Sequence, residues 1–223
     1  MADGFHAGRT FGAFLFDMDG TIVNSLAVVN RVWSAWARKH NVADVEEFMR
    51  TMHGIRAVEN IRRLGLPGIE IEREAEAITI AEMEDVDGIL PIEGALAFLS
   101  ALPEGRWAIV TSAIRELALK RLAAAGLPVP RVLVTAEDVA HGKPAPDCFL
   151  LAAERLGVPI GDCLVFEDAP AGIKAAEAAG AAVAVVTATH SHVLETPHPS
   201  FADYGRLSLV ANEPDGLRFG RAA

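Results

Sequence analysis

Two aspartates follow an apolar run near the amino terminus, in the stretch GAFLFDMDGTIVNS that spans residues 12–25. Asp17 and Asp19 are two positions apart, so on an extended chain their side chains face the same side of the strand. Two carboxylates held that close together need a cation between them. The pair therefore marks a candidate metal-binding site, although Asp and Gly are also common in ordinary turns.

Polar side chains also follow three later apolar runs of the chain: Thr111 and Ser112 after WAIV, Lys143 after RVLVT, and Glu167 and Asp168 after CLVF. Each of them has a structural explanation, as a strand-end hydroxyl, a solvated loop charge or the N-cap of a helix. Together with the two aspartates they supply a nucleophile, an acid–base group, a hydroxyl donor, a cation and metal-binding carboxylates. That combination is the one expected of an active site.

The segments that must position these residues alternate between strand-like and helix-like patterns. Short apolar runs, typical of parallel strands covered on both faces, occur at residues 13–16, 107–111, 131–135, 163–166 and 182–186. Between the later runs, helical patterns that end at a glycine occur at Ile114–Ala125, Pro146–Leu156 and Ala171–Ala179. The alternation predicts an α/β fold with a doubly wound, Rossmann-like parallel sheet, which binds ligands at the carboxyl edge of its strands.

Residues from about 25 to 90 break this alternation. Helical patterns without a convincing strand occur there at Ser25–His40, Asp44–His53, Ala57–Leu64 and Ile69–Val86. We therefore expect a helical cap domain at residues 23–92, inserted after the first strand of a core domain made of residues 1–22 and 93–223. After Thr187 the pattern is weak, which predicts a loop before a last short strand at Leu207–Val210.

Composition excludes several classes of protein. The formal net charge of −10 disfavours nucleic acid and anionic membrane surfaces as partners. No apolar run approaches the roughly 20 residues of a membrane span, and the first residues do not resemble a signal peptide, so a cytoplasmic location is predicted. Cys148 and Cys163 lack metal-ligand spacing and are expected to be small buried apolar residues.

Taken in order, FDMDGT, Thr111, GKPAPD and VFEDAPAG resemble the four motifs of the haloacid dehalogenase superfamily, and the likeness covers nearly the whole chain. The resemblance implies that Asp17 is the nucleophile and Asp19 the general acid–base group. It also implies that Thr111 and Lys143 hold the phosphate, with Ser112 as a neighbouring candidate for substrate binding. The implied Mg²⁺ site consists of Asp17, the backbone carbonyl of Asp19, Glu167 and Asp168.

Within the superfamily, the segments around these motifs are similar to bacterial sugar phosphatases and to yeast glycerol-phosphate and 2-deoxyglucose-6-phosphate phosphatases. This likeness implies a Mg²⁺-dependent phosphatase that acts on sugar or polyol monophosphates through an aspartyl-phosphate. The partner is then a small phosphate ester, and the protein is expected to be a monomer or a small homo-oligomer.

The segment TMHGIRAVEN lies between two predicted helices of the cap and is the candidate for contact with the rest of the substrate. His53 and Arg56 flank Gly54 there, and the segment resembles the H-G-x-R stretch of the glycerol-phosphate phosphatases. Both residues also have a structural explanation, because His suits a helix C-terminus and Arg56 can be a solvated residue of the next helix.

Proteins with two other functions use much of the same set of residues. A β-phosphoglucomutase-like isomerase uses the same core residues, and that family carries its cap arginine one residue later. A phospho-accepting receiver module also combines an aspartate, metal-binding acids, a hydroxyl and a lysine. The order of the motifs and the long helical insert argue against the receiver module.

Overall fold

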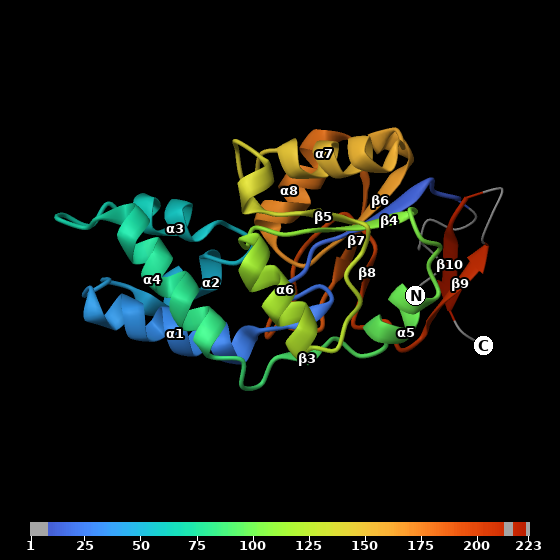
Figure 1. Ribbon diagram of the computed structural model, residues 1–223. Coiled ribbons are helices and arrows are strands. Elements are labelled where there is room, and N and C mark those ends of the chain that lie inside the picture. The colour runs from blue at the N-terminus through green and yellow to red at the C-terminus, as the bar shows by residue number, and fades with distance from the viewer. Residues whose placement is uncertain (1–8, 212–215, 222–223) are drawn as a thin grey trace.

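The computed structural model describes residues 9–211 and 216–221 and is built around a six-stranded parallel sheet with the order β5-β4-β1-β6-β7-β8 (Figure 1). The strands are β1 (Ala13–Phe16), β4 (Trp107–Val110), β5 (Val132–Val134), β6 (Cys163–Glu167), β7 (Ala182–Val186) and β8 (Ser200–Phe201). β1 pairs with β4 on one side and with β6 on the other. The carboxyl ends of these three strands therefore meet at one edge, and the predicted doubly wound sheet is confirmed.

Helices cover both faces of the sheet, as the alternating pattern requires. One face packs against α5 (Ala95–Ser100) and α6 (Arg115–Ala124), and the other against α7 (Asp147–Leu156) and α8 (Pro170–Ala179). Figure 1 shows α7 and α8 together on one side of the sheet. The bounds of α6, α7 and α8 differ from the predicted ones by one residue at most at either end.

An aromatic cluster fixes the two central strands beneath the sheet edge. Phe16 of β1 stacks on Phe166 of β6 with ring centroids 4.6 Å apart, and Phe14 meets the same ring edge-on at 5.3 Å. Phe98 of α5 and Tyr204 complete the cluster with centroids 5.3 Å apart. Because these rings are buried and close-packed, the residues that follow β1 and β6 start from a rigid base.

The predicted insert consists of the four helices α1 (Leu26–Lys39), α2 (Val45–Thr51), α3 (Ala57–Leu64) and α4 (Ile71–Glu84). They share an apolar cluster of their own, which includes Trp33, Trp36 and Phe48. The chain enters and leaves this group through the antiparallel pair β2 (Val23–Asn24) and β3 (Leu90–Pro91). The domain limits at residues 23 and 92 stay a prediction, and β2 and β3 lie just inside them.

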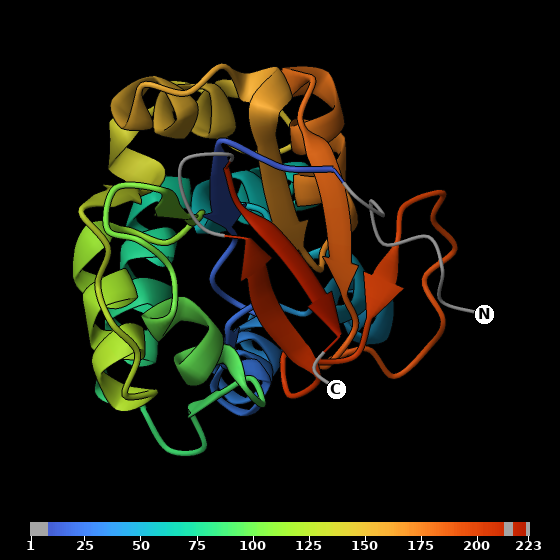
Figure 2. The ribbon, with the colours of Figure 1, turned by 90° about the vertical axis from the view of Figure 1, so that its right-hand side faces the viewer.

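The region after Thr187 differs from the prediction. Instead of one long loop it contains β8, which extends the main sheet because Val185 donates to the Pro199 carbonyl and Thr187 to that of Phe201. The predicted strand at Leu207–Val210 forms as β9 (Leu207–Ala211), but it is not the last one, since it pairs with β10 (Arg218–Arg221) in a separate antiparallel hairpin (Figure 2). A strand of two residues, such as β8, shows no period in the sequence.

Two further expectations concern the cysteines and membrane-spanning segments. Cys148 and Cys163 are both buried and free, as predicted. Within residues 9–211 and 216–221, no helix has the length and apolar character that crossing a membrane requires.

Candidate active site

Asp17, which directly follows β1, lies in a buried cluster of charges at the sheet edge. The Lys143 ammonium donates to Asp17 Oδ1, to Glu167 Oε1 at 2.8 Å and to the Val110 carbonyl at 3.3 Å. Although burial lowers the pKa of Lys143, the adjacent Asp17 and Glu167 raise it further, so the ammonium stays protonated. The structure thus brings the three charged residues of three separate motifs into direct contact.

Carboxylate oxygens of Asp17, Glu167 and Asp168 all lie within 4.8 Å of one another. Burial raises the pKa of Asp17 to about 7, against the lowering effect of Lys143. Burial likewise raises the pKa of Asp168, and the charges of Glu167 and Asp17 add to the shift. One ammonium does not balance three buried carboxylates, so this set of hard oxygen donors fits a divalent cation.

Glu167, the last residue of β6, and Asp168, which follows it, have different partners. Glu167 uses both oxygens within the protein, because Oε1 accepts from Lys143 and Oε2 accepts the backbone N–H groups of Asp168 at 2.8 Å and Ala169 at 2.9 Å. Asp168 receives one hydrogen bond on Oδ1, from the Thr21 hydroxyl at 3.2 Å. Asp168 is therefore better placed than Glu167 to bind a metal ion directly.

Two glycines make room for these carboxylates. Gly20 has φ +87°, and a Cβ there would lie 2.0 Å from Asp168 Oδ2. A Cβ at Gly172 of α8 would lie 1.5 Å from Glu167 Oε1. Neither position tolerates a side chain unless the acidic residue moves.

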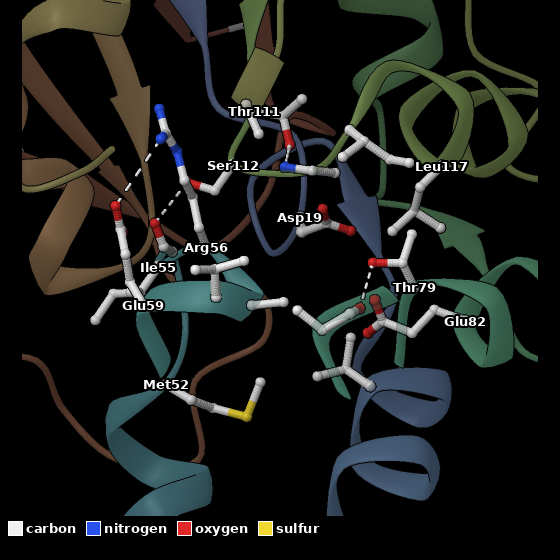
Figure 3. Close-up of a pocket in the computed structure, with 18 of the residues that line it drawn as sticks. Asp19, Met52, Ile55, Arg56, Glu59, Thr79, Glu82, Thr111, Ser112 and Leu117 are labelled. Carbon is white, nitrogen blue, oxygen red and sulfur yellow. Dashed lines mark hydrogen bonds and ion pairs between the residues drawn. The ribbon is translucent and has the colours of Figure 1, made fainter. Parts of the chain in front are cut away.

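Asp19 does not join the buried cluster through its side chain. Its Oδ1 accepts a hydrogen bond from the Ser25 hydroxyl at 2.6 Å, and its Oδ2 one from Arg121 Nη1 at 2.8 Å. Figure 3 shows the carboxylate between the core residues Thr111 and Ser112 and residues of the cap helix α4. The two aspartates thus face different partners, and the role of the Asp19 carbonyl as a metal ligand stays a prediction.

A cleft of about 800 Å³ separates the sheet edge from the cap. The core contributes Asp17, Asp19, Thr111, Ser112 and Arg121 to its lining, and the cap contributes Trp33, Met52, His53, Arg56, Glu76, Thr79 and Glu82, among others. Several of these side chains are drawn in Figure 3. The cleft is large enough for a small phosphate ester, and Asp17 of the charged cluster lines it.

The two hydroxyl residues after β4 have different roles in the structure. Thr111 is buried, and its Oγ1 accepts a hydrogen bond from the Ala113 N–H at 3.1 Å. The Ser112 hydroxyl donates to the Gly54 carbonyl of the cap at 2.8 Å. Thr111 therefore lies at the sheet edge as predicted, whereas Ser112 connects the core to the cap.

The cap segment with His53 and Arg56 reaches the cleft, as predicted. Burial lowers the pKa of His53, and the charge of Asp19 offsets only part of that shift. Arg56 is the N-cap residue of α3, and its guanidinium donates to the Val139 carbonyl at 2.9 Å and the Ala140 carbonyl at 3.2 Å. Arg56 thus attaches the cap to the core, and its contact with substrate stays a prediction.

Sequence patterns did not single out Arg121 or Glu82, both of which are buried. Arg121 Nη2 lies 3.1 Å from Glu82 Oε1, so one guanidinium joins a cap carboxylate to Asp19. A signal was present in the helical pattern of α6, where Arg121 shares a face with the buried Leu117 and Ala118. Because a single charged residue on the apolar face of a helix needs a buried partner, this position could have been recognised from the sequence.

Comparison with known proteins agrees with this geometry. Residues 11–180 match the profile of the haloacid dehalogenase-like hydrolases. Hexitol phosphatase A of Escherichia coli is 42% identical over 211 residues, which are 91% of this chain and 95% of that protein. Glycerol-1-phosphate phosphohydrolase 2 of Saccharomyces cerevisiae is 34% identical over 189 residues, 79% of this chain and 75% of that protein.

Solved structures show the same architecture. A hydrolase from Pseudomonas syringae superposes with a TM-score of 0.72 at 28% identity and covers 79% of this chain and 84% of its own. CbbY from Rhodobacter sphaeroides, solved in complex with phosphate, has the same fold with a TM-score of 0.72 at 22% identity, over 87% of this chain and 95% of its own. The chain therefore belongs to the haloacid dehalogenase-like hydrolase family, which confirms the resemblance of its four motifs.

Proposed function

We propose that this protein is a Mg²⁺-dependent phosphatase that hydrolyses monophosphates of polyols or sugars through an aspartyl-phosphate on Asp17. The observation that carries the proposal is the buried cluster of Asp17, Lys143, Glu167 and Asp168, of which Asp17 lines the cleft between core and cap. The names of the relatives support the substrate class, since one is a hexitol phosphatase and another a glycerol-1-phosphate phosphohydrolase.

Asp17 is the nucleophile of this mechanism. Its carboxylate attacks phosphorus, and the bond from phosphorus to the ester oxygen breaks. Asp19 acts as the general acid and gives a proton to the departing alkoxide. Asp19 then takes a proton from the water that attacks the aspartyl-phosphate, and inorganic phosphate leaves while Asp17 is restored. Dividing the reaction in this way suits phosphate esters, whose uncatalysed hydrolysis is very slow.

The other members of the cluster orient the reacting groups. Lys143 holds the Asp17 carboxylate and supplies positive charge to the transferring phosphoryl oxygens, and Thr111 offers its hydroxyl to the same oxygens. Asp17 and Asp168 are the direct protein ligands that we assign to Mg²⁺, while Glu167 holds Lys143 in place. When bound, Mg²⁺ neutralises the repulsion between an anionic nucleophile and an anionic substrate.

The charges of the cleft favour a phosphatase over a mutase. A mutase must hold the second phosphate of its bisphosphate intermediate with positive groups on the cap. The three arginines that line the cleft are already paired, Arg56 with core carbonyls, Arg62 with Glu72 and Arg121 with two carboxylates. The family assignment also removes the receiver module from consideration.

A substrate panel tests the proposal. Phosphate release is measured from glucitol 6-phosphate, glycerol 1-phosphate, glucose 6-phosphate and 6-phosphogluconate, with MgCl₂ and with excess chelator. We expect turnover of the three phosphate esters whose polyol or sugar part is uncharged. We expect little turnover of 6-phosphogluconate, because its sugar-acid part carries a second anionic group, and no turnover of any ester with chelator. Release of an isomerised phosphate ester from β-glucose 1-phosphate, instead of inorganic phosphate, would favour the mutase. The cytoplasmic location and the oligomeric state stay predictions from the sequence.

A further inference from the structure

Arg121 lies between two carboxylates that belong to different parts of the chain. It extends from the core helix α6, contacts Asp19 of the sheet edge through Nη1 at 2.8 Å, and faces Glu82 of the cap helix α4 through Nη2 at 3.1 Å. Its side chain is only 5% exposed, and that of Glu82 is 8% exposed. Since α4 packs directly against α6, this contact joins the cap to the core inside the cleft.

The contact determines the orientation of the Asp19 carboxylate. Ser25 holds one oxygen and Arg121 holds the other, so rotation of the carboxylate requires that one of the two hydrogen bonds break. Glu82 in turn is held by the indole N–H of Trp33 at 3.2 Å, within the apolar cluster of the cap. A continuous set of contacts thus runs from the cap interior to Asp19.

Stability alone does not account for this arrangement. Desolvation of buried charges costs free energy, and apolar side chains of similar volume often stabilise a protein as well or better. Arg121 also leaves its buried Nε–H without a hydrogen-bond partner, and its Nη2 meets Glu82 as an ion pair rather than as a hydrogen bond, which adds to the cost. Burial raises the pKa of Glu82 although Arg121 acts to lower it, so this position disfavours the charged carboxylate.

We propose that Arg121 is a positioning residue that couples the docking of cap helix α4, through Glu82, to the orientation of the Asp19 carboxylate. When the cap is docked, Glu82 occupies one side of the guanidinium and holds its other side against Asp19. When α4 moves away, the guanidinium loses that restraint and Asp19 loses its fixed orientation. Proton transfer by Asp19 is then efficient only beneath a docked cap. This inference rests on the proposed function.

Kinetics with two esters test the coupling. In Arg121→Met we expect kcat for glucitol 6-phosphate to fall on the order of 10²-fold with little change in KM, because Asp19 no longer lines up with the leaving oxygen. With 4-nitrophenyl phosphate we expect the first turnover to keep its rate and to appear as a burst, since nitrophenolate leaves without a proton. Arg121→Lys should restore part of kcat. A purely structural role predicts equal losses for both esters and no burst.

A double-mutant cycle tests the part played by Glu82. We expect Glu82→Gln to lower kcat about tenfold, and the double variant with Arg121→Met to be no slower than Arg121→Met alone. Additive losses would overturn the coupling. Arg115→Met is the matched control, because Arg115 lies on the same helix but pairs with Asp138 away from Asp19, and its kcat should stay close to that of the wild type.

Hydrogen exchange provides a readout that does not need substrate. The amides of α4 should exchange faster in Arg121→Met and Glu82→Gln than in the wild type or in Arg115→Met. Unchanged exchange in both variants, or a kcat of Arg121→Met within about twofold of the wild type, would overturn the proposal. Failure of the wild type to hydrolyse either ester would instead overturn the proposed function, while the exchange result would still decide whether Arg121 docks the cap.

Discussion

Similar charged residues occur in different surroundings on the core side and on the cap side of the cleft. On the core side, Lys143 is 1% exposed and Glu167 is fully buried. On the cap side, Arg62 and Glu72 form an ion pair at 3.4 Å with side chains that are 57% and 77% exposed. Attraction at about 4 Å is worth about 1 kcal/mol in water and about 4 kcal/mol at an effective dielectric constant near 20.

The comparison gives a physical reason to expect chemistry on the core side of the cleft and selectivity on the cap side. Buried charges at strand ends act strongly on each other and on a phosphoryl group, and the rigid sheet keeps them in place. Exposed charges on the cap helices, such as Arg62 and Glu72, are screened by water and move with the cap, so we expect them to affect substrate choice more than the chemical step. Each of the four following changes is expected to have a smaller effect than the one before.

The largest effect is expected for Asp17→Asn, which tests the core side. An amide is a poor nucleophile and a weaker metal ligand, so turnover should fall on the order of 10⁴–10⁶-fold. The rate of phosphate release from glucitol 6-phosphate measures this fall in turnover. Mass spectrometry of the variant excludes deamidation of the new Asn back to Asp. The same substitution on the cap, Asp44→Asn, should leave turnover near the wild-type value, because Asn caps a helix about as well as Asp. Full turnover of Asp17→Asn would contradict the mechanism.

The second change, Gly172→Ala, alters the core side without removing a functional group. The added Cβ would lie 1.5 Å from Glu167 Oε1, so Glu167 and with it Lys143 must shift. We expect kcat/KM to fall on the order of 10²-fold. Gly161→Ala is the control, because a Cβ there meets nothing within 4 Å. Equal activity in both variants would show that the position of Glu167 does not matter.

The third change, Asp138→Asn, concerns the core loop whose carbonyls at Val139 and Ala140 accept hydrogen bonds from the cap residue Arg56. Although burial raises the pKa of Asp138, hydrogen bonds from Arg155 and Thr135 outweigh it and lower the pKa from 3.8 to about 2. A folded-state pKa below the unfolded value contributes stability that is present above about pH 4 and is lost as the pH falls toward 2. Because water screens this partly exposed carboxylate, Asp138→Asn should cost less than the full shift implies, about 1.5 kcal/mol at neutral pH.

Chemical denaturation of wild type and Asp138→Asn between pH 2 and pH 7 measures this difference, which should shrink steadily below about pH 4. Asp162→Asn serves as a control at an exposed position. A difference that stays constant down to pH 2 would rule out the charge of Asp138 as its cause.

The smallest effect is expected on the cap side. Arg56→Met and His53→Ala should each change the ratio of kcat/KM between two panel substrates by about tenfold, because they alter the wall that faces the leaving group. The Mg²⁺ requirement should stay the same, since neither side chain reaches the buried carboxylates. An unchanged substrate ranking in both variants would leave Arg56 as a structural link between cap and core.

Most of the fold and of the core site could be predicted because their signals are local. Each signal lies within a short stretch of sequence: an apolar run, a glycine that ends a helix, or the residues that follow a strand. Parallel strands then bring their carboxyl ends to one edge of the sheet. Asp17, Thr111, Glu167 and Asp168 therefore lie where the patterns predict them. Strand β8 escaped prediction because two residues are too few to show a period, and its pairing with β7 depends on a chain segment folded back from residue 187.

The chemistry that we propose for this protein follows from the sequence alone, because the proposed nucleophile, acid–base group and metal-binding carboxylates are assigned from residue types, their order along the chain and their resemblance to the four family motifs. The contacts between the cap and these core residues, in contrast, became visible in the tertiary structure alone. Arg121 and Asp19 are 102 positions apart, and Arg56 and Val139 are 83 positions apart. No local pattern records such contacts, since they depend on how two separately packed groups of helices and strands fit together.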